Sequence, residues 1–265
     1  MDEAPHLLVE ETGGIIIATL NRPDKLNAIT KPMMDLFREA VVRFRDTDEL
    51  KVMLIRATGR YFCSGADLRG GGGTTKHTAS GFREGLRRGV YGFQETWDEM
   101  EHIEKPFVIA HHAMCVGGGL EMSLSCDFRF AAKSAAYSFP EGLFGSLPAS
   151  NGVSRLTRIC GPHWARWLVM ANKPASADMA FTMGLVHQVF PDESFEQEVM
   201  EFCRHLARQN VEQMAAAKIA IELATEVGRD SARHIERMAN AGLRLNPGYD
   251  ARMAEYMSKL GGKGK

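Results

Sequence analysis

Apolar and polar positions in the first part of the chain alternate between strand-like and helix-like patterns. Residues 7–11 and 14–20 are short β-rich runs separated by a Gly-Gly turn, which predicts a hairpin. Thr30 precedes apolar residues at helical spacing, which predicts a capped helix, and a long amphipathic helix is expected at about 82–103. Further apolar runs of strand length predict strands at 52–56, 107–110, 127–131 and 136–139.

Beyond residue 153 the pattern becomes helical almost throughout. Helices are expected at 162–170, 195–208, 211–227 and 230–243, with one short strand at 187–190. The sequence contains no convincing repeat of roughly 20–50 residues. It therefore predicts an α/β core over residues 1–190 and a helical region over residues 191–265. The apolar faces of the helical region are expected to pack on the core and on neighbouring subunits.

Composition and charge exclude several classes of protein. Lys and Arg (32) balance Asp and Glu (33) among the 265 residues, so no broad attraction for nucleic acid or an anionic membrane is expected. No apolar run approaches the roughly 20 residues that cross a bilayer, and the acidic N-terminus does not resemble a signal peptide. Five scattered cysteines, none in a CxxC pair, favour reduced thiols over disulfides or a zinc site. We expect a soluble cytoplasmic protein without a metal ion.

Glycines concentrate in two loops that each precede a predicted short helix, CSGADL (63–68) and VGGGLE (116–121). Backbone N–H groups at the start of a helix lack partners within the helix, and glycine lets a ligand approach them closely. Two such loops side by side would form an oxyanion hole, and ordinary strand-to-helix turns are the alternative. Neither loop has a nucleotide-binding spacing, and the run Gly70–Gly73 is interpreted as a flexible lid or a linker.

Two glutamates accompany these loops. Glu121 lies three residues after Gly118, on the same helical face one turn further along. Glu141 lies in an apolar stretch, 135–147, where partial desolvation would raise its pKa and suit a general acid. The alternatives are a surface or salt-bridged helix residue for Glu121 and an exposed loop carboxylate for Glu141.

Four motifs together resemble those of the crotonase, or enoyl-CoA hydratase/isomerase, superfamily. They are NRPDKLNAI (21–29), GRYFCSGADL (59–68), GGGLEMSLSCDFRFAA (117–132) and FPEGLFGSLP (139–148), and their order and separation fit over nearly all of the chain. The resemblance implies an α/β fold, a crotonase-like spiral of ββα units followed by a C-terminal helical trimerisation region. It also implies a homotrimer or a homohexamer.

The same resemblance implies roles for individual residues. The backbone N–H groups of Ala66 and Gly118 would hold the thioester oxygen of an acyl-CoA substrate. No cofactor is required beyond the CoA moiety of that substrate. The residues implied in binding this moiety are Leu26, Ala28, Ala66, Asp67 and Leu68 beside the adenine and pantetheine, Arg22, Lys25 and Arg69 beside the phosphates, and Tyr256 and Lys259 near the C-terminus.

The presence of both glutamates resembles the pattern of the hydratases, which add water across a 2-enoyl thioester. By this resemblance Glu121 is expected to act as the base that activates water for attack at Cβ. Glu141 is expected to donate a proton to Cα, and the oxyanion hole would stabilise the enolate that forms in between.

The sequence departs from the hydratase pattern after Pro148, where Ala149-Ser150-Asn151-Gly152 replaces a glycine-rich run. The side chains of Ala149 and Asn151 are expected close to the acyl chain and the water. They would narrow the pocket, add an amide hydrogen bond or change the reaction, so a specialised acyl-CoA is expected. The alternatives to a hydratase are an enoyl-CoA isomerase that uses Glu141, another acyl-CoA lyase or hydrolase, and a non-catalytic CoA-binding subunit.

Overall fold

The computed structural model describes residues 4–69, 78–87 and 93–261. The chain forms two compact units, Met1–Arg208 and Gln209–Lys265. This boundary lies later than the position after residue 190 that the sequence predicts. The reason is helix α7 (Phe195–Ala207), which packs on the main sheet of the first unit and therefore belongs to it.

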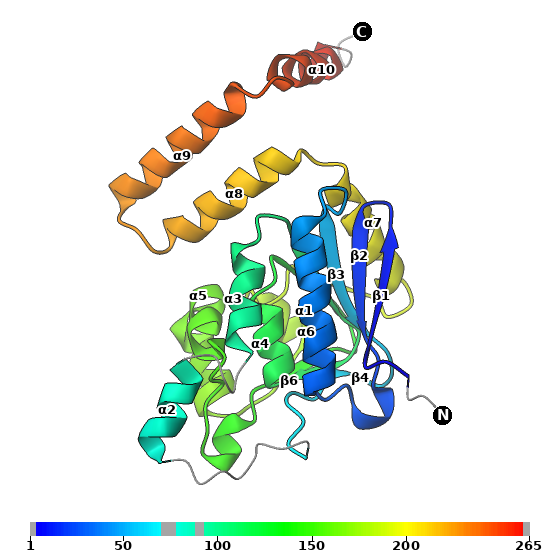
Figure 1. The fold of residues 1–265 in the computed structure, drawn as a ribbon, viewed down its shortest axis with the longest axis vertical. Coiled ribbons are helices and arrows are strands. Elements are labelled where there is room, and N and C mark those ends of the chain that lie inside the picture. The colour runs from blue at the N-terminus through cyan, green and yellow to red at the C-terminus, as the bar shows by residue number, and fades with distance from the viewer. Residues whose placement is uncertain (1–3, 70–77, 88–92, 262–265) are drawn as a thin grey trace. The chain divides into compact units, whose positions relative to one another are not determined.

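Two β-sheets form the centre of the first unit (Figure 1). The larger sheet contains, in spatial order, β1 (Leu7–Thr12), β2 (Ile15–Leu20), β3 (Val52–Ala57), β5 (Phe107–His111), β7 (Phe128–Ala132) and β10 (Gln188–Phe190). The smaller sheet contains β4 (Tyr61–Cys63), β6 (Met114–Val116), β8 (Ala136–Ser138) and β9 (Ala175–Ser176). The predicted hairpin β1–β2 and the pair β8–β9 are antiparallel, and the other neighbours are parallel.

Each pass of the chain adds one strand to each sheet. β3 is followed by β4, β5 by β6 and β7 by β8, with the first strand of each pair in the larger sheet and the second in the smaller sheet. β3, β5 and β7 are parallel neighbours, and so are β4, β6 and β8. The chain therefore advances by one strand per turn, which is the spiral of ββα units that the resemblance implies.

Helices cover both faces of the larger sheet (Figure 1). α1 (Lys31–Asp46) begins at Thr30, whose Oγ1 accepts a hydrogen bond from Met33 N at 3.3 Å, as the capping pattern predicts. α1 packs on β1 and β2, whereas α7 packs on β2, β3, β5 and β7. Since both faces are covered, all six residues of β2 are buried instead of every second one.

Several local predictions differ from the structure. The single helix expected at about 82–103 is two helices, α2 (Ala79–Arg87) and α3 (Gln94–His102), and residues 88–92 lie outside the described part. α5 (Gly152–Ala165) is interrupted at Gly161, with a φ of 74°, and leads directly into the π-helix η3 (Arg166–Met170). β4 and β6 fall where no strand is predicted, because each is a short run that directly precedes a glycine-rich loop and shows no alternating pattern. The run Gly70–Gly73 also lies outside the described residues.

The remaining helices of the first unit are short: η1 (Pro23–Lys25), α4 (Gly118–Leu124), η2 (Glu141–Phe144) and α6 (Ala177–Thr182). The second unit consists of α8 (Val211–Ala224), α9 (Arg229–Arg244) and α10 (Tyr249–Gly261), and α8 packs against α9. No side chain between positions 209 and 260 is fully buried. Within the described ranges, every helix is too short or too polar to cross a membrane.

Candidate active site

Three parallel strands of the smaller sheet are each followed by one part of the candidate site. Ala66 follows β4, Gly118 follows β6 and Glu141 follows β8. Because these strands are parallel neighbours, their carboxyl ends meet at one edge of the sheet. Ligand sites of α/β proteins commonly lie at such an edge. The topology therefore brings together groups that lie far apart in the sequence.

A buried asparagine of the first motif holds the turn that leads into β4, the strand before the loop that carries Ala66. Asn27 Nδ2 donates to the carbonyl oxygens of Thr58 (2.7 Å) and Tyr61 (2.9 Å), and its Oδ1 accepts from the Arg22 N–H (2.7 Å). Asn27 also has a φ of 52°, a left-handed conformation that asparagine adopts more readily than most residues. Asn27 thus joins segment 22–28 to the turn between β3 and β4.

The Ala66 N–H points away from Ile29, which bonds to the residues on either side of Ala66. Ile29 N–H donates to Gly65 O (2.8 Å), and Asp67 N–H donates to Ile29 O (2.9 Å). A parallel bridge of this kind leaves the N–H of the central residue on the other side. Gly118 is the first residue of α4, so its N–H lacks a partner within the helix. Among the described residues, neither N–H donates a hydrogen bond.

The two glycine loops approach each other closely. A Cβ atom on Gly65 would lie 3.4 Å from Gly118 N and 3.2 Å from Val116 O, and Gly65 has a φ of 90°. A Cβ atom on Gly119 would lie 2.6 Å from Cys63 Cβ. Side chains at these positions would therefore push the loops apart. The two predicted oxyanion donors lie on adjoining stretches of backbone.

Glu121 lies in the first turn of α4 and is only 5% exposed, so the surface position considered for it is wrong. Its Oε1 accepts a hydrogen bond from Ser150 N–H at 2.7 Å. Burial raises the pKa of Glu121 to about 7, opposed by hydrogen bonds from Ser150 and Gly152 and by the charge of Arg155, and supported by the charge of Glu141. A carboxyl group with this pKa can take up or release a proton at neutral pH.

Glu141 begins η2 and places its carboxylate against the second glycine loop. A Cβ atom on Gly117 would lie 2.7 Å from Glu141 Oε1, and Gly117 has a φ of 52°, so glycine is needed there for two reasons. Burial also raises the pKa of Glu141. Its Oε2 is buried and has no hydrogen-bond partner within the described part of the chain. Such an oxygen is suited to accept a hydrogen bond from water or to carry a proton.

Ala149 and Asn151, the two departures after Pro148, lie in different environments. Ala149 is exposed, and its carbonyl oxygen accepts a hydrogen bond from Gln94 Nε2 at 3.0 Å. Asn151 has a φ of 65°, a conformation that glycine also adopts, and its Nδ2 donates to Asp98 Oδ1 at 2.9 Å. The amide of Asn151 is therefore engaged by α3.

Comparison with known proteins identifies the family of the chain. The family model described as enoyl-CoA hydratase/isomerase matches residues 10–244. The chain belongs to this family. A carnitinyl-CoA dehydratase of Salmonella typhi is 34% identical over 230 residues, which cover 86% of this chain and 81% of the relative. A crotonyl-CoA hydratase of Syntrophomonas wolfei subsp. wolfei is 28% identical over 232 residues, which cover 87% of this chain and 86% of the relative.

Solved structures show the same fold. An enoyl-CoA hydratase from Bacillus anthracis superposes with a TM-score of 0.87 at 25% identity, covering 96% of each chain. An enoyl-CoA hydratase subunit from Geobacillus kaustophilus superposes with a TM-score of 0.86 at 27% identity, covering 96% of this chain and 95% of the other. The chain is therefore a crotonase-superfamily enzyme of the hydratase/dehydratase type that acts on CoA thioesters.

The residues predicted to bind CoA in this crotonase divide between its two units. In the first unit, Arg22 Nη1 forms an ion pair with Asp67 Oδ2 at 2.6 Å, and both side chains are largely buried. Arg22 thus has a partner within the protein. The other members in this unit are exposed or half-buried: Lys25, Arg69 and Leu68, which is 80% exposed, and Leu26 and Ala28, which are half-buried.

Tyr256 and Lys259 lie on α10 in the second unit, where both are exposed and Lys259 Nζ pairs with Glu255 Oε1 at 2.6 Å. Their contact with CoA stays a prediction. No three His, Cys, Asp or Glu side chains of the described ranges are grouped so that they could hold a metal ion. The expectation that this crotonase needs no cofactor beyond the CoA of its substrate stays a prediction as well.

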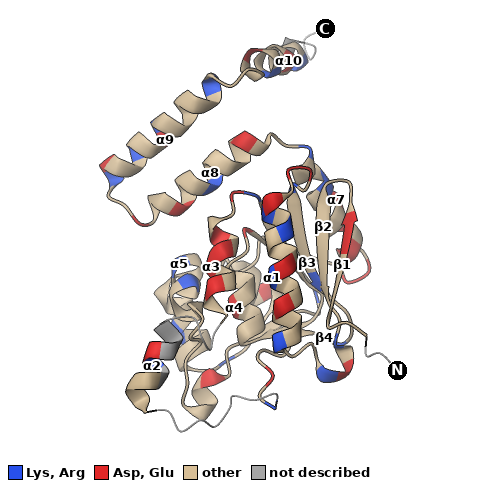
Figure 2. Ribbon diagram, in the orientation of Figure 1, with Lys and Arg blue, Asp and Glu red and all other residues tan. Residues whose placement is uncertain are grey.

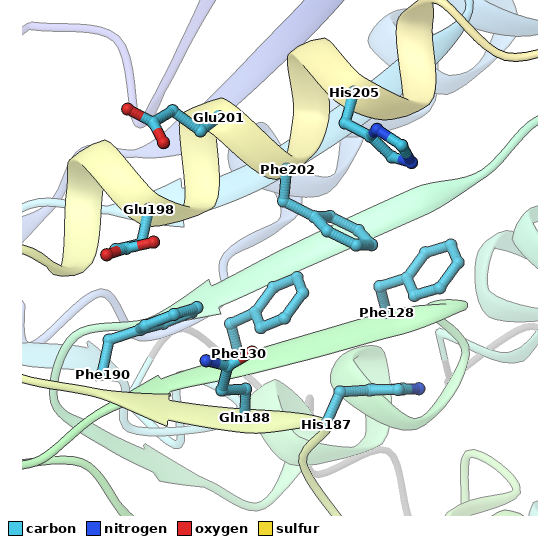
Figure 3. Close-up of a pocket in the computed structure, with 9 residues that line it drawn as sticks. All are labelled: Phe128, Phe130, His187, Gln188, Phe190, Glu198, Glu201, Phe202 and His205. Atoms are coloured by element: carbon cyan, nitrogen blue, oxygen red, sulfur yellow. The ribbon is translucent and has the colours of Figure 1, made fainter. Parts of the chain in front are cut away.

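A separate cavity of about 420 Å³ lies between α7 and strands β7 and β10 (Figure 3). The ring of Phe202 on α7 packs against the rings of Phe128 (5.0 Å between centroids) and Phe130 (4.7 Å). None of the predicted site residues lines this cavity, whose full lining is Phe128, Phe130, His187, Gln188, Phe190, Glu198, Glu201, Phe202 and His205. The cavity lies where α7 packs on the larger sheet, and neither Glu121 nor Glu141 lines it.

Two residues near the carboxylates, Phe93 and Arg155, were not predicted from the sequence. Phe93, which precedes α3, lies against the oxyanion loop, and a Cβ atom on Gly118 would lie 3.1 Å from its Cε2. Arg155 lies on the buried face of α5 and pairs with acidic residues of α3, a helix rich in such residues (Figure 2). The sequence does contain a signal for Arg155, because an arginine among the buried positions of an amphipathic helix is rare unless it is paired.

Proposed function

We propose that this crotonase catalyses the reversible addition of water to a 2-enoyl-CoA, and thus also the dehydration of a 3-hydroxyacyl-CoA. The main support is the pair Glu121 and Glu141, two carboxyl groups with raised pKa beside two backbone N–H groups that have no partner among the described residues. The relatives named carnitinyl-CoA dehydratase and crotonyl-CoA hydratase support the same class of reaction.

The thioester oxygen would bind between the N–H groups of Ala66 and Gly118. These donors face an oxygen that becomes negative when the substrate turns into an enolate, so they stabilise the transition state more than the substrate. A single donor of this kind contributes about 2.7–4 kcal/mol in other enzymes. Bound in this way, the acyl group would extend from the glycine loops toward the two carboxylates.

Hydration would proceed from a water held by the two carboxylates. The water oxygen attacks Cβ, Glu121 takes the proton that the water loses, and the π electrons of the Cα–Cβ bond move into the enolate. The enolate then collapses, and Cα takes the proton carried by Glu141. One water is consumed and one C–O and one C–H bond form. Glu121 ends protonated and Glu141 ends ionised.

The reverse reaction starts with the proton on Glu121. Burial raises the pKa of Glu121 to about 7 and also raises the pKa of Glu141, so the pair can hold a shared proton near neutral pH. With the proton on Glu121, Glu141 can remove the Cα proton of a 3-hydroxyacyl-CoA while Glu121 protonates the leaving hydroxyl group. Both directions need one proton on the pair, so bell-shaped pH profiles with the same two apparent pKa values are expected for kcat/KM in both directions.

The acyl group is proposed to be specialised. Phe93 covers Gly118 beside the oxyanion donors, with its Cε2 3.1 Å from where a Cβ atom on Gly118 would lie, so an aromatic side chain limits the space for the acyl chain. An enoyl-CoA isomerase is the second candidate, because Glu141 alone would suffice to move a proton between two carbons through its Oε2, which has no hydrogen-bond partner in the described part of the chain. Another thioester lyase or hydrolase and a CoA-binding subunit without activity remain as outcomes of the test.

The deciding experiment incubates the protein with 2-enoyl-, 3-enoyl- and 3-hydroxyacyl-CoA esters of several acyl groups and identifies products by mass. Gain or loss of one water supports the hydratase, whereas a shifted double bond without water supports the isomerase. Free CoA would indicate a hydrolase, and binding without any turnover would indicate a non-catalytic subunit. Glu121→Gln and Glu141→Gln should each abolish the water exchange, and unchanged rates in both variants would contradict the two-carboxylate mechanism.

We further propose that the enzyme assembles as a homotrimer or homohexamer. Large apolar side chains are exposed on η2 and η3, two elements that contact each other: Leu143, Phe144 and Met170. Such a patch on a single chain is typical of a surface that binds another protein. Light scattering after size-exclusion chromatography would measure the mass, and a monomer at micromolar concentration would contradict the assembly.

A further inference from the structure

A network of hydrogen bonds around Arg155 connects α3 and α5 to Glu121. Arg155 is 6% exposed and makes a bidentate contact with Glu101, Nε–Oε1 2.7 Å and Nη2–Oε2 2.6 Å. Nη2 also lies 2.5 Å from Asp98 Oδ1. The guanidinium group is therefore fixed from two sides by carboxylates of one helix, a planar arrangement that arginine suits better than lysine.

The remaining nitrogen of this guanidinium group acts on the loop that holds Glu121. Arg155 Nη1 donates to Ser150 O at 3.0 Å, and the N–H of the same Ser150 donates to Glu121 Oε1 at 2.7 Å. Ser150 Oγ in turn accepts from Phe93 N–H at 3.4 Å, and Asn151 Nδ2 donates to Asp98. The loop is thus held to α5 at Ser150 and to α3 at Asn151, the residue next to the one that contacts the carboxylate.

The fit around Glu121 leaves little freedom for this loop. A Cβ atom on Gly152 would lie 2.8 Å from Glu121 Oε1 and 2.7 Å from Pro148 Cβ. A loop that moved by a fraction of this distance would lose the hydrogen bond to Glu121 or press on its carboxylate. The position of Ser150 therefore determines the orientation of Glu121.

We propose that Arg155 is a positioning residue, which fixes Ser150 so that the Ser150 N–H holds Glu121 in the orientation needed for proton transfer. Arg155 does not reach the reacting atoms and acts through the loop. This role deepens the proposed hydratase function and rests on it. Asp98 and Glu101 hold Arg155 in place, and Asn151, one of the two departures from the glycine-rich pattern, joins the same network through Asp98.

The charged groups around Glu121 define what a titration will report. Glu141 of η2 raises the pKa of Glu121, and Arg155 of α5 lowers it. β4 and β6, which also pack on α4, contribute the thiols of Cys63 and Cys115, whose pKa values burial raises, so they are neutral near pH 7. Loss of Arg155 removes both a positive charge and the support for the Ser150 N–H, and both changes raise the pKa of Glu121.

The test compares wild type with Arg155→Gln and Arg155→Lys. In the ligand-free protein, the ionisation of Glu121 is followed by infrared spectroscopy of its protonated carboxyl band, assigned by its loss in Glu121→Gln. In Arg155→Gln this titration should move to higher pH. With an enoyl-CoA substrate, kcat should fall by about 10- to 100-fold with little change in KM, as expected for a displaced catalytic group. Arg155→Lys keeps the charge and should recover part of both losses.

The matched control is Arg45→Gln. Arg45 also pairs with an acidic residue of α3, Nη1 to Glu99 Oε1 at 2.8 Å, but this contact is exposed and has no bond to the Ser150 loop. It should leave the titration of Glu121 and kcat unchanged. If Arg155→Gln lowers only the melting temperature and leaves the titration and kcat as in wild type, Arg155 is a structural residue and the positioning role is wrong.

A second variant covers the case in which Arg155→Gln does not fold. The side chain of Asp98 is 41% exposed, so Asp98→Asn introduces no buried charge imbalance, yet it weakens the hold on Arg155. It should move the titration of Glu121 and lower kcat in the same directions but by less, and an unchanged titration would overturn the positioning role. The infrared titration needs no substrate. If the protein hydrates no CoA ester, the proposed function is wrong, but the infrared titration still tests whether Arg155 positions Glu121.

Discussion

The buried carboxyl group of Glu121 makes a strong prediction about the stability of the protein at different pH values. Its pKa rises from 4.5 to about 7 in the folded protein, chiefly because burial disfavours the ionised form. Each pKa unit corresponds to about 1.4 kcal/mol, so ionised Glu121 lowers the free energy of unfolding by about 3 kcal/mol. The side chain is 5% exposed, and solvent therefore screens little of this effect.

The sign follows from the direction of the pKa change. Below pH 4.5 the group is protonated in both the folded and the unfolded chain, so its ionisation does not lower the free energy of unfolding. As the pH rises toward about 7, the unfolded chain ionises first, so wild type loses stability until the folded group ionises as well. Glu121→Gln is neutral at every pH and can still accept the Ser150 hydrogen bond. Its stability relative to wild type should therefore increase with pH by about 3 kcal/mol and level off above neutral pH.

Urea unfolding followed by tryptophan fluorescence can measure this difference, because Trp97 is completely buried. Both proteins are unfolded at a series of pH values from about 4.5 to 8.5, and the two free energies are subtracted at each pH. Glu141→Gln serves as a control that should show the same trend with a smaller amplitude, since Glu141 is less buried. A difference between Glu121→Gln and wild type that stays constant with pH would refute the assignment of Glu121 as a buried carboxyl group with a raised pKa.

Three other substitutions test the loops around the site. Gly117→Ala should lower kcat/KM by about 100-fold or more, because the new Cβ lies 2.7 Å from Glu141 Oε1; activity within a few-fold of wild type would contradict the close contact. Asn27→Ala should lower the free energy of unfolding by about 3 kcal/mol, measured in urea, since it leaves buried backbone groups without partners. Asn151→Gly keeps the left-handed backbone and should leave the preference for acyl-chain length unchanged in a substrate panel, because the amide binds Asp98. A changed preference would place that amide in the acyl pocket.

The larger sheet could be predicted from the sequence because its strands are long and apolar. β2 and β3 are covered on both faces, so they appear as continuous apolar runs, and the turn before β2 contains two glycines with positive φ. In the smaller sheet β8 could be predicted, but β4 and β6 could not, because each is a short run directly before a glycine-rich loop. The spiral repeats the same unit of structure without repeating its sequence, so a search for repeats does not find it.

Some residues of the candidate site could likewise be predicted from the sequence, and others could not. The glycine loops and Glu121 could be identified because their motifs are contiguous in the chain, and a turn of helix separates Gly118 from Glu121. Arg155 could not be connected to Glu121, because the connection passes through Ser150 and is supported by residues of α3, more than 50 positions away. Contacts of this kind depend on how helices pack, which a single sequence does not reveal.

The order of β4, β6 and β8 has a consequence for how such a site can diverge. Two of the three groups that follow these strands are backbone N–H donors, which no change of side chain removes, and only the third is a side chain. Substitutions at Glu121 or Glu141 can therefore replace the proton chemistry while the hold on a thioester persists. A family built on this plan can change its reactions one side chain at a time and still inherit its class of substrate.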